Sequence, residues 1–279
     1  MLPDASLPVD YPLLDGATLP AIGFGLYKVD DADTLRVVPE ALDAGYRLID
    51  GAQFYSNERA LGQAYAAAGR PAGVQVASKF WGDPVQSYEQ VFADFARTEA
   101  DLDLGRPLDL YLIHWPRPSR GAYVDVWRAL IELRDAGRVR SIGVANFRAH
   151  EIERLIDETG VVPVLNQVES HPWLPQQELR AFHERHGIVT QAWSPLGRGR
   201  LLGDPVLGAI GARYGVTAAQ VILRWHRQLG GAAVPKSVTP ARLRQNLDLD
   251  GFALDDADMA RIATLASGER TGTDPADRE

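Results

Sequence analysis

Residues 108–146 read LDLYLIHWPRPSRGAYVDVWRALIELRDAGRVRSIGVAN and contain two apolar runs separated by a stretch of helical period. The runs Leu108–Ile113 and Ser141–Val144 have the length of strands, and Ala122–Ala136 has the apolar spacing of an amphipathic helix. Near-continuous apolar strands are typical of a parallel sheet that is buried on both faces. This stretch therefore predicts a strand–helix–strand unit.

Units of this kind repeat along the chain at a spacing of about thirty residues. The expected strands are Ala21–Gly25, Arg47–Ile49, Val74–Ala77, Leu108–Ile113, Ser141–Val144, Val164–Leu165, Ile188–Trp193 and Ala232–Val234. The expected helices are Ala32–Ala44, Asn57–Ala68, Gln86–Asp103, Ala122–Ala136, His150–Glu158, Gln176–His186, Ala218–Gln228 and Pro240–Leu247. The alternation predicts a closed (β/α)8 TIM barrel, with a doubly wound open sheet as the alternative. We expect one such domain over residues 1–279.

Three segments lie outside the repeats. Tyr11–Leu19 carries Asp15 and Gly16 at its middle, a turn pair that predicts a β-hairpin before the first barrel strand, where it caps the bottom of the barrel. We expect irregular tails at residues 1–10 and 267–279, the second because it is polar and carries glycine and proline.

The composition excludes several classes of function. The chain holds 29 lysine and arginine residues against 37 aspartate and glutamate residues, a net charge of -8, whereas a nucleic-acid-binding protein needs a basic face. The absence of cysteine excludes disulfides, thiolate zinc sites, iron–sulfur clusters and a cysteine nucleophile. No stretch reaches the roughly 18 apolar residues of a membrane span. We expect a cytoplasmic protein without a nucleic-acid, membrane or metal partner.

Polar side chains stand where the apolar strands end. They are Asp50, Lys79, His114, Asn146, Asn166, Gln167, Ser194, Lys236 and Ser237. The carboxyl ends of parallel barrel strands open at one mouth, and barrel enzymes carry their chemistry there. Any one of these residues alone is more simply a cap for the next helix or turn, but the set predicts a site.

Tyr55 and three of these residues form a set with acid–base chemistry. Tyr55 follows the strand that ends at Asp50, and Lys79 and His114 end the next two strands. A lysine ammonium beside a tyrosine lowers the pKa of the phenol, and a carboxylate keeps a buried lysine charged. We therefore expect Lys79 and Asp50 to tune Tyr55 as a proton donor, and His114 to offer a ring N–H to a carbonyl oxygen. The structural alternatives are a solvent-exposed hydroxyl, a buried ion pair and a core histidine.

Six motifs, spread over nearly the whole chain, carry a resemblance to a known family. They are LIDGAQFYSNE at 48–58, ASKFW at 77–81, DLYLIHWP at 109–116, IGVANF at 142–147, NQVE at 166–169 and PKS at 235–237. With them the sequence resembles the aldo-keto reductases. Trp81, Trp115 and the short C-terminal region look most like the bacterial 2,5-diketo-D-gluconate reductase branch.

The resemblance implies an NADPH-dependent carbonyl reductase and assigns roles to particular residues. Tyr55 matches the general acid, Lys79 and Asp50 its tuning pair, and His114 the residue that orients the substrate. The matching cofactor positions are Asn146 and Gln167 for the nicotinamide carboxamide, Trp193 for ring stacking, Ser194, Leu196 and Gly197 for the pyrophosphate, Lys236, Ser237 and Arg242 for the 2'-phosphate, and Gln245 and Asn246 for adenine. Ala145 stands where the family often has serine, so one hydroxyl contact to the carboxamide is missing.

The implied reaction is hydride transfer from NADPH to an aldehyde or ketone, with Tyr55 protonating the alkoxide as it forms. The expected pocket walls are Tyr27, Phe54, Trp81 and Trp115. Such walls suit keto-sugars, dicarbonyls or aromatic aldehydes. Two alternatives stay open: a Schiff-base aldolase with Lys79 as nucleophile, and a non-catalytic barrel that senses NADPH. Members of the family are usually monomers, so the resemblance implies a monomer. The sequence does not identify the physiological substrate, the favoured direction of the reaction or the degree of preference for NADPH over NADH.

Two further segments carry histidines. His183 and His186 lie three residues apart on an expected helix, and because no third ligand is placed to complete a metal site, we interpret both as surface residues. The segment His171-Pro172-Trp173 is predicted to be a loop that borders the substrate.

Overall fold

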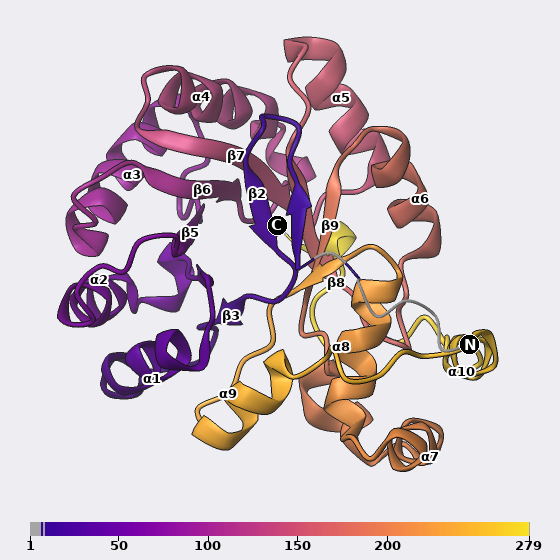
Figure 1. Ribbon diagram of the computed structural model, residues 1–279. Helices are drawn as coiled ribbons and strands as arrows, with labels where there is room; N and C mark the ends of the chain where they lie inside the picture. The colour runs from indigo at the N-terminus through magenta and orange to yellow at the C-terminus, as the bar shows by residue number, and fades with distance from the viewer. Residues whose placement is uncertain (1–6, 8, 279) are drawn as a thin grey trace.

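The computed structural model describes residues 7 and 9–278, and its centre is a ring of parallel strands surrounded by helices (Figure 1). In chain order the strands of the ring are β3 (Phe24–Gly25), β4 (Leu48–Asp50), β5 (Gln75–Phe80), β6 (Leu108–Ile113), β7 (Val139–Ala145), β8 (Leu165–Glu169), β9 (Val189–Trp193) and β10 (Ala232–Ala233). Each strand pairs with the next one along the chain, so the strand order never reverses within this sheet.

The first and last strands of the sheet meet through the residues that precede β3. Ile22 forms a parallel bridge with Ala233. The Gly23 amide donates to the Ala233 carbonyl at 2.9 Å, and the Ala233 amide donates to the Ala21 carbonyl at 2.8 Å. These bonds close the sheet, so the predicted (β/α)8 barrel is confirmed and the open sheet is excluded.

Helices cover the outside of the barrel (Figure 1). They are α1 (Asp31–Ala44), α2 (Glu58–Ala67), α3 (Tyr88–Leu102), α4 (Tyr123–Asp135), α5 (Ala149–Thr159), α6 (Gln177–Arg185), α7 (Pro205–Tyr214), α8 (Ala218–Gln228), α9 (Pro240–Leu247) and α10 (Asp256–Ala263). The predicted helices all form, with their ends shifted by at most two residues. The sequence analysis missed α7 and α10, which pack with α8 in an apolar cluster of their own that includes Leu207, Trp225 and Ile262.

The predicted N-terminal hairpin consists of β1 (Asp10–Pro12) and β2 (Thr18–Pro20). Between them Gly16 adopts a φ of 85°, a left-handed conformation that glycine tolerates. The Tyr11 hydroxyl donates to the Gly231 carbonyl at 3.3 Å, and the Gln75 side chain donates to the Thr18 carbonyl at 2.7 Å. Because Gly231 and Gln75 lie where β10 and β5 begin, the hairpin closes the amino end of the barrel and not the opposite mouth.

The barrel interior is filled by alternate strand side chains and by the hairpin. Leu48, Leu110, Leu112 and Val234 belong to this inner cluster, whereas intervening residues such as Ile49 pack outward against the helices. Among the described residues no single helix is long and apolar enough to cross a membrane, and α7 and α8 meet that criterion only as a pair bent by 88°. The predicted tail at residues 1–10 falls mainly outside the described residues, and Asp10 already belongs to β1.

Candidate active site

Lys79, on β5, lies at the mouth of the barrel and is fully buried. Its Nζ donates to the two carboxylate oxygens of Asp50, at 2.8 and 2.9 Å, and to the Gly51 carbonyl at 2.7 Å. The Tyr55 hydroxyl lies 3.5 Å from the same nitrogen, because the 3-10 turn Gln53–Tyr55 follows β4 directly. The structure thus brings together three of the four residues that the sequence analysis grouped.

Tyr55 is held in its protonated form. Burial raises the pKa of Tyr55 well above its ordinary value of 10.0, and the negative charge of Asp50 raises it further. The prediction that Lys79 lowers this pKa is therefore wrong, because the loss of hydration outweighs an ammonium whose charge is already neutralised by Asp50. Burial also lowers the pKa of Lys79, while its ion pair with Asp50 opposes that change.

His114 stands at the end of β6 beside Tyr55. The two ring centroids are 5.8 Å apart, with an angle of 80° between the ring planes. Burial lowers the pKa of His114 well below 6.5, and the positive charges of Lys79 and Arg278 lower it further. The imidazole is therefore neutral and keeps a single N–H. The Asn146 side-chain nitrogen donates to the His114 carbonyl at 2.9 Å, which fixes the backbone at this strand end.

One cavity of about 740 Å³ joins these groups to the other predicted site residues. Its lining includes Tyr27, Asp50, Phe54, Tyr55, Trp81, His114, Trp115, Asn146, Gln167, Trp193, Ser194, Leu196, Lys236, Ser237, Arg242, Gln245 and Asn246. Two predicted residues do not line it. Lys79 lies behind Asp50 and Tyr55, and Gly197 is buried against Leu201, where a Cβ would be 2.9 Å from the leucine Cδ1.

Aromatic rings form the wall of the cavity next to Tyr55. Phe54 and Trp81 are stacked with centroids 4.0 Å apart, and the Trp81 ring lies 5.1 Å from the His114 ring. Tyr27 is 5.3 Å from Tyr55. These rings place apolar surface around the hydroxyl and the imidazole, which strengthens the electrostatic interactions between them.

The three residues predicted to contact nicotinamide meet beside this wall. The Asn146 side-chain oxygen accepts from Trp193 Nε1 at 2.8 Å. The Gln167 side-chain nitrogen donates to Asp50 at 2.9 Å and to Gln191 at 2.6 Å. Protein groups therefore fix the orientation of both amides and of the indole at the mouth.

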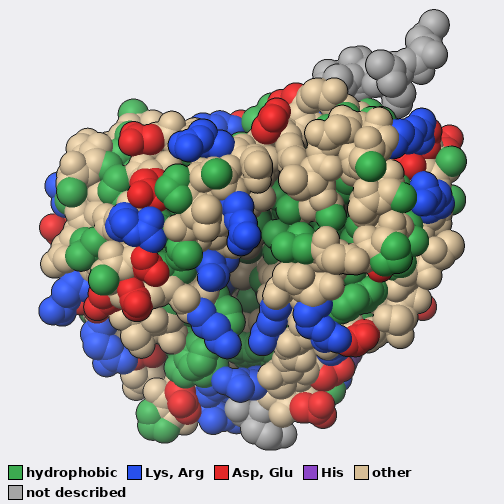
Figure 2. All heavy atoms as spheres, turned by 90° about the horizontal axis from the view of Figure 1, so that it is seen from below, with side chains coloured by type: hydrophobic (Ala, Val, Ile, Leu, Met, Phe, Trp, Pro, Cys, Tyr) green, Lys and Arg blue, Asp and Glu red, His purple; other side chains and the backbone are tan. Residues whose placement is uncertain are grey.

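The opposite arm of the cavity reaches the start of α9, where Lys236 and Arg242 are exposed on either side of Ser237. The Thr239 amide donates to the Ser237 hydroxyl at 3.1 Å, which holds this turn in place. Figure 2, seen from the side of α1, α7 and α9, shows a hollow with lysine and arginine side chains gathered around it.

The charge of the cavity is strongly one-sided. Its cations are Lys28, Arg198, Lys236, Arg242 and Arg278, and none of them forms an ion pair with a carboxylate of the described residues. Asp50 is the one carboxylate in the described lining, and it is bound to Lys79. In a chain of net charge -8, such a concentration of unpaired cations favours a ligand with several negative charges.

Sequence reasoning missed Lys28 and Arg278 as lining residues. Lys28 is one of only three lysines in the chain, and this rarity could have marked it as a site residue. Arg278 lies in the predicted irregular tail and belongs to none of the six motifs. The loop at His171 was also misjudged. His171 is buried against Glu169, and the Trp173 carbonyl accepts the amides of Ser267 and Gly268, so this loop holds the C-terminal segment and does not line the described cavity.

The interpretation of His183 as a surface residue is wrong. Its ring is fully buried between α6 and the barrel, with Nε2 3.0 Å from the Asn166 side chain and Nδ1 2.8 Å from the Thr190 hydroxyl. His186, three residues further, is half-buried. Over residues 7 and 9–278 no group of three histidine, aspartate or glutamate side chains is arranged to hold a metal ion.

Comparisons with known proteins agree with this geometry. A sequence model described as "Aldo/keto reductase family" matches residues 21–267. An aldo-keto reductase of Mycolicibacterium smegmatis is 47% identical over 94% of this chain and 95% of its own length. Methylglyoxal reductase DkgA of Escherichia coli is 39% identical, with the same shares covered. The crystal structure of a Gox0644 mutant in complex with NADPH has a TM-score of 0.92 at 42% identity and covers 98% of this chain and 99% of that one.

The chain belongs to the aldo/keto reductase family, as the motifs predicted. It is accordingly an oxidoreductase of a carbonyl-reducing class. NADPH, which one solved relative holds, is also the cofactor that the sequence predicted.

Proposed function

We propose that this chain reduces an aldehyde or ketone to an alcohol with NADPH, and that Tyr55 supplies the proton. The observation that carries the proposal is the position of the Tyr55 hydroxyl, 3.5 Å from Lys79 Nζ and beside the neutral His114 ring in the cavity wall. Bound in the cavity, NADPH would supply the hydride that the carbonyl carbon accepts.

Each of the four polar residues has one task in this proposal. The N–H of His114 donates to the carbonyl oxygen and orients it. Tyr55 gives its proton to that oxygen as negative charge develops, and the transfer is favourable because an alkoxide is a far stronger base than a phenolate. Lys79 then stabilises the negative charge that remains on the Tyr55 oxygen. The Asp50 carboxylate keeps Lys79 protonated for this role.

The cavity's cations fit a phosphorylated dinucleotide. Lys236, Ser237 and Arg242 surround the first turn of α9, an arrangement suited to a 2'-phosphate. The remaining proposed contacts are Asn146 and Gln167 with the carboxamide, Trp193 with the ring, Ser194, Leu196 and Gly197 with the pyrophosphate, and Gln245 and Asn246 with adenine. That Lys236 and Arg242 lack an ion pair with any described carboxylate supports this assignment, since a bound phosphate would supply the missing negative charge.

The substrate class is proposed from the aromatic wall. Tyr27, Phe54, Trp81 and Trp115 suit keto-sugars, dicarbonyls and aromatic aldehydes, and the name of the E. coli relative makes methylglyoxal a natural first probe. The aldolase alternative is disfavoured, because Lys79 Nζ donates to three protein oxygens and does not line the cavity.

Loss of NADPH absorbance with methylglyoxal, a keto-sugar and an aromatic aldehyde tests the proposal, with NADH run in parallel. We expect turnover with NADPH and weaker turnover with NADH. NADPH binding without turnover on any carbonyl would instead indicate a non-catalytic NADPH-binding barrel, and a borohydride-trapped adduct on Lys79 would indicate an aldolase. We also propose that the enzyme is a cytoplasmic monomer, and light scattering during size-exclusion chromatography measures its oligomeric state.

A further inference from the structure

Glu58 is a buried carboxylate that the proposed reaction does not use. It is the first residue of α2 and is 6% exposed. No lysine or arginine of the described residues lies within ion-pair distance of it, and two hydroxyl groups take the place of a cation. The Ser78 hydroxyl donates to Oε1 at 2.5 Å, and the Thr98 hydroxyl donates to Oε2 at 3.3 Å. Burial raises the pKa of Glu58, while these two hydrogen bonds oppose that change.

A line of hydrogen bonds connects this carboxylate to the 3-10 turn Gln53–Tyr55. Gln53, the first residue of the turn, donates from Nε2 to Thr98 Oγ1 at 3.1 Å. The Oε1 of the same side chain accepts from the Trp81 amide at 2.9 Å. All three donors in this line therefore point toward the Glu58 carboxylate. An ionised acceptor at the end of such a line strengthens and orients the bonds that precede it.

The two ends of this line meet the chain on either side of Lys79. Ser78 directly precedes Lys79 on β5, and Trp81 follows it by two residues, just beyond the end of the strand. Successive strand side chains point to opposite faces, so Ser78 faces the helices while Lys79 faces the barrel interior. Among the described residues Lys79 is the one hydrogen-bond partner of the Tyr55 hydroxyl. The position of that hydroxyl therefore depends on the turn that carries it.

We propose that Glu58, Thr98 and Gln53 form a brace that positions the proton donor from outside the barrel. The brace rests on the carbonyl reduction proposed above, which gives Tyr55 and Lys79 their roles. None of its three residues lines the cavity, so they act through the turn and through β5. Proton transfer requires donor and acceptor within hydrogen-bond reach, so a turn that is free to shift lowers turnover while every reacting group is still present.

Thr98 is the member of the brace that can be changed with the least change of shape. Thr98→Val replaces the hydroxyl by a methyl group, and Thr98→Ser keeps the hydroxyl. Thr34→Val is the matched control, because Thr34 is also fully buried on a helix, α1, and its hydroxyl has no hydrogen-bond partner among the described residues. Gln53→Met, at a half-buried position, keeps the length of the side chain and removes both of its polar groups.

Hydrogen exchange of the Trp81 amide, followed by NMR, reports on the brace without substrate or cofactor. This amide is protected by its hydrogen bond to Gln53 Oε1. In Thr98→Val we expect it to exchange about two- to tenfold faster, the range for one neutral hydrogen bond. Thr98→Ser and Thr34→Val should exchange at the wild-type rate.

Turnover of methylglyoxal gives the functional measurement. Thr98→Val should lower kcat by the same factor of about two to ten, while the Kd of NADPH stays within about twofold. Thr98→Ser should restore kcat, and Thr34→Val should resemble the wild type. Gln53→Met should show the loss of Thr98→Val. The double variant should lose no more than either single variant, because both changes break one connection.

Several outcomes would overturn the proposal. They are an unchanged kcat or an unchanged Trp81 exchange rate in Thr98→Val, losses that add in the double variant, and an equal loss in Thr34→Val. If Thr98→Val does not fold, Gln53→Met carries the same two measurements. Failure of the proposed function looks different, because the wild-type enzyme would then reduce no carbonyl, while the exchange of the Trp81 amide would still show whether the brace holds.

Discussion

Replacing Asp50 by asparagine tests the buried ion pair on which the proton donor depends. In the wild type, Asp50 Oδ1 accepts from Lys79 at 2.8 Å and from Gln167 at 2.9 Å, and Oδ2 accepts from Lys79 at 2.9 Å. An amide has one acceptor and one donor end, so Lys79, which contacts both carboxylate oxygens, must face an NH2 group in either orientation of the amide. Lys79 is 0% exposed and has no solvent to replace the lost partner.

The expected loss of stability follows from two limits. Removing one member of a buried ion pair costs about 3–5 kcal/mol, because the other charge is left uncompensated. Lys79 can escape by releasing its proton, which at pH 7 costs about 4.6 kcal/mol for a group whose ordinary pKa is near 10.4. We therefore expect Asp50→Asn to lower the free energy of unfolding by about 3–4.5 kcal/mol at pH 7.

The sign of the pH dependence distinguishes this cause from a simple packing defect. Without Asp50 the folded-state pKa of Lys79 lies below its unfolded value, so the unfolded chain binds more protons and stability rises with pH. The deficit of the variant relative to the wild type should therefore shrink from pH 7 to pH 9, by up to about 1.4 kcal/mol per pH unit.

Urea unfolding at pH 7, 8 and 9, followed by tryptophan fluorescence, measures these differences. The double variant Asp50→Asn/Lys79→Met is the matched control, because it removes the stranded charge and should recover most of the lost stability. A deficit below about 1 kcal/mol at pH 7, or one that stays constant with pH, would refute the reasoning.

Three further outcomes are expected. Tyr55→Phe should lower kcat by about two to four orders of magnitude while NADPH affinity, measured by fluorescence titration, is kept; more than a tenth of the wild-type turnover would contradict its role as proton donor. Arg242→Ala should weaken NADPH about ten- to a hundredfold and leave NADH within about threefold, whereas equal losses would remove it from the phosphate site. Burial lowers the pKa of His183 and His226 to about 3. As pH falls from 6.5 to 5, both histidines therefore become protonated in the unfolded chain but stay neutral in the folded chain. The free energy of unfolding should then fall by up to about 1.4 kcal/mol per histidine per pH unit, and it should fall less steeply in His183→Gln. Equal pH dependence of the unfolding free energy in wild type and variant, measured by urea titration, would contradict this.

The barrel and the four polar residues at its mouth could be predicted because both follow from short-range pattern. Asp50, Lys79 and His114 stand at or next to the ends of apolar runs, so locating the strand also locates the side chain, and Tyr55 follows in the turn after β4. The electrostatic balance at Tyr55 could not be predicted, since it depends on how completely Asp50 neutralises Lys79 and on how far Tyr27 and His114 exclude water. Those quantities arise from packing across four strand ends.

The two missed helices show where pattern reasoning was incomplete. Asp204 accepts from the amides that begin α7, and Pro205 occupies the first turn, so start signals were present in the sequence. Gly208 and Gly211 weaken the helical pattern, yet a Cβ at Gly211 would lie 2.5 Å from the Val216 carbonyl. The second glycine is therefore needed for close packing, which only the folded chain reveals.

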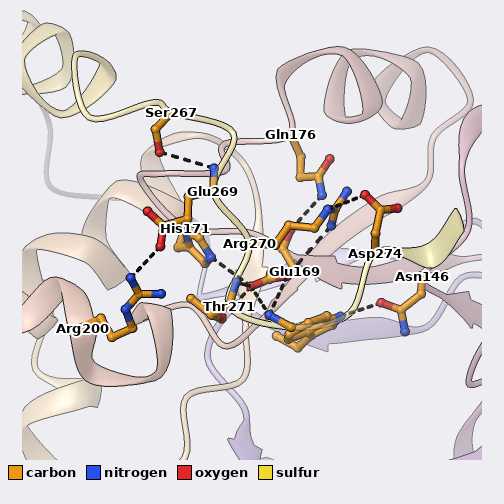
Figure 3. A network of polar contacts seen from close by, with 12 residues as sticks. Asn146, Glu169, His171, Gln176, Arg200, Ser267, Glu269, Arg270, Thr271 and Asp274 are labelled. Atoms are coloured by element: carbon orange, nitrogen blue, oxygen red, sulfur yellow. Dashed lines mark hydrogen bonds and ion pairs between the residues drawn. The ribbon is translucent and has the colours of Figure 1, made fainter. Parts of the chain in front are cut away.

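The segment that follows the family match comes from a different part of the chain than the residues proposed for the chemistry. The family match ends at residue 267, and Glu169 accepts from the amide and hydroxyl of Thr271 (Figure 3) in the segment that follows that boundary, whose Arg278 lies over the Trp81 ring. Since this segment contributes none of the four residues proposed for proton transfer, loosening it should leave the ion pair of Lys79 and Asp50 intact. Loosening the segment, as Glu169→Gln would do by weakening the hydrogen bonds from Thr271 and Gly272, should therefore raise KM for the carbonyl substrate more than it lowers kcat, and an equal effect on both would contradict this.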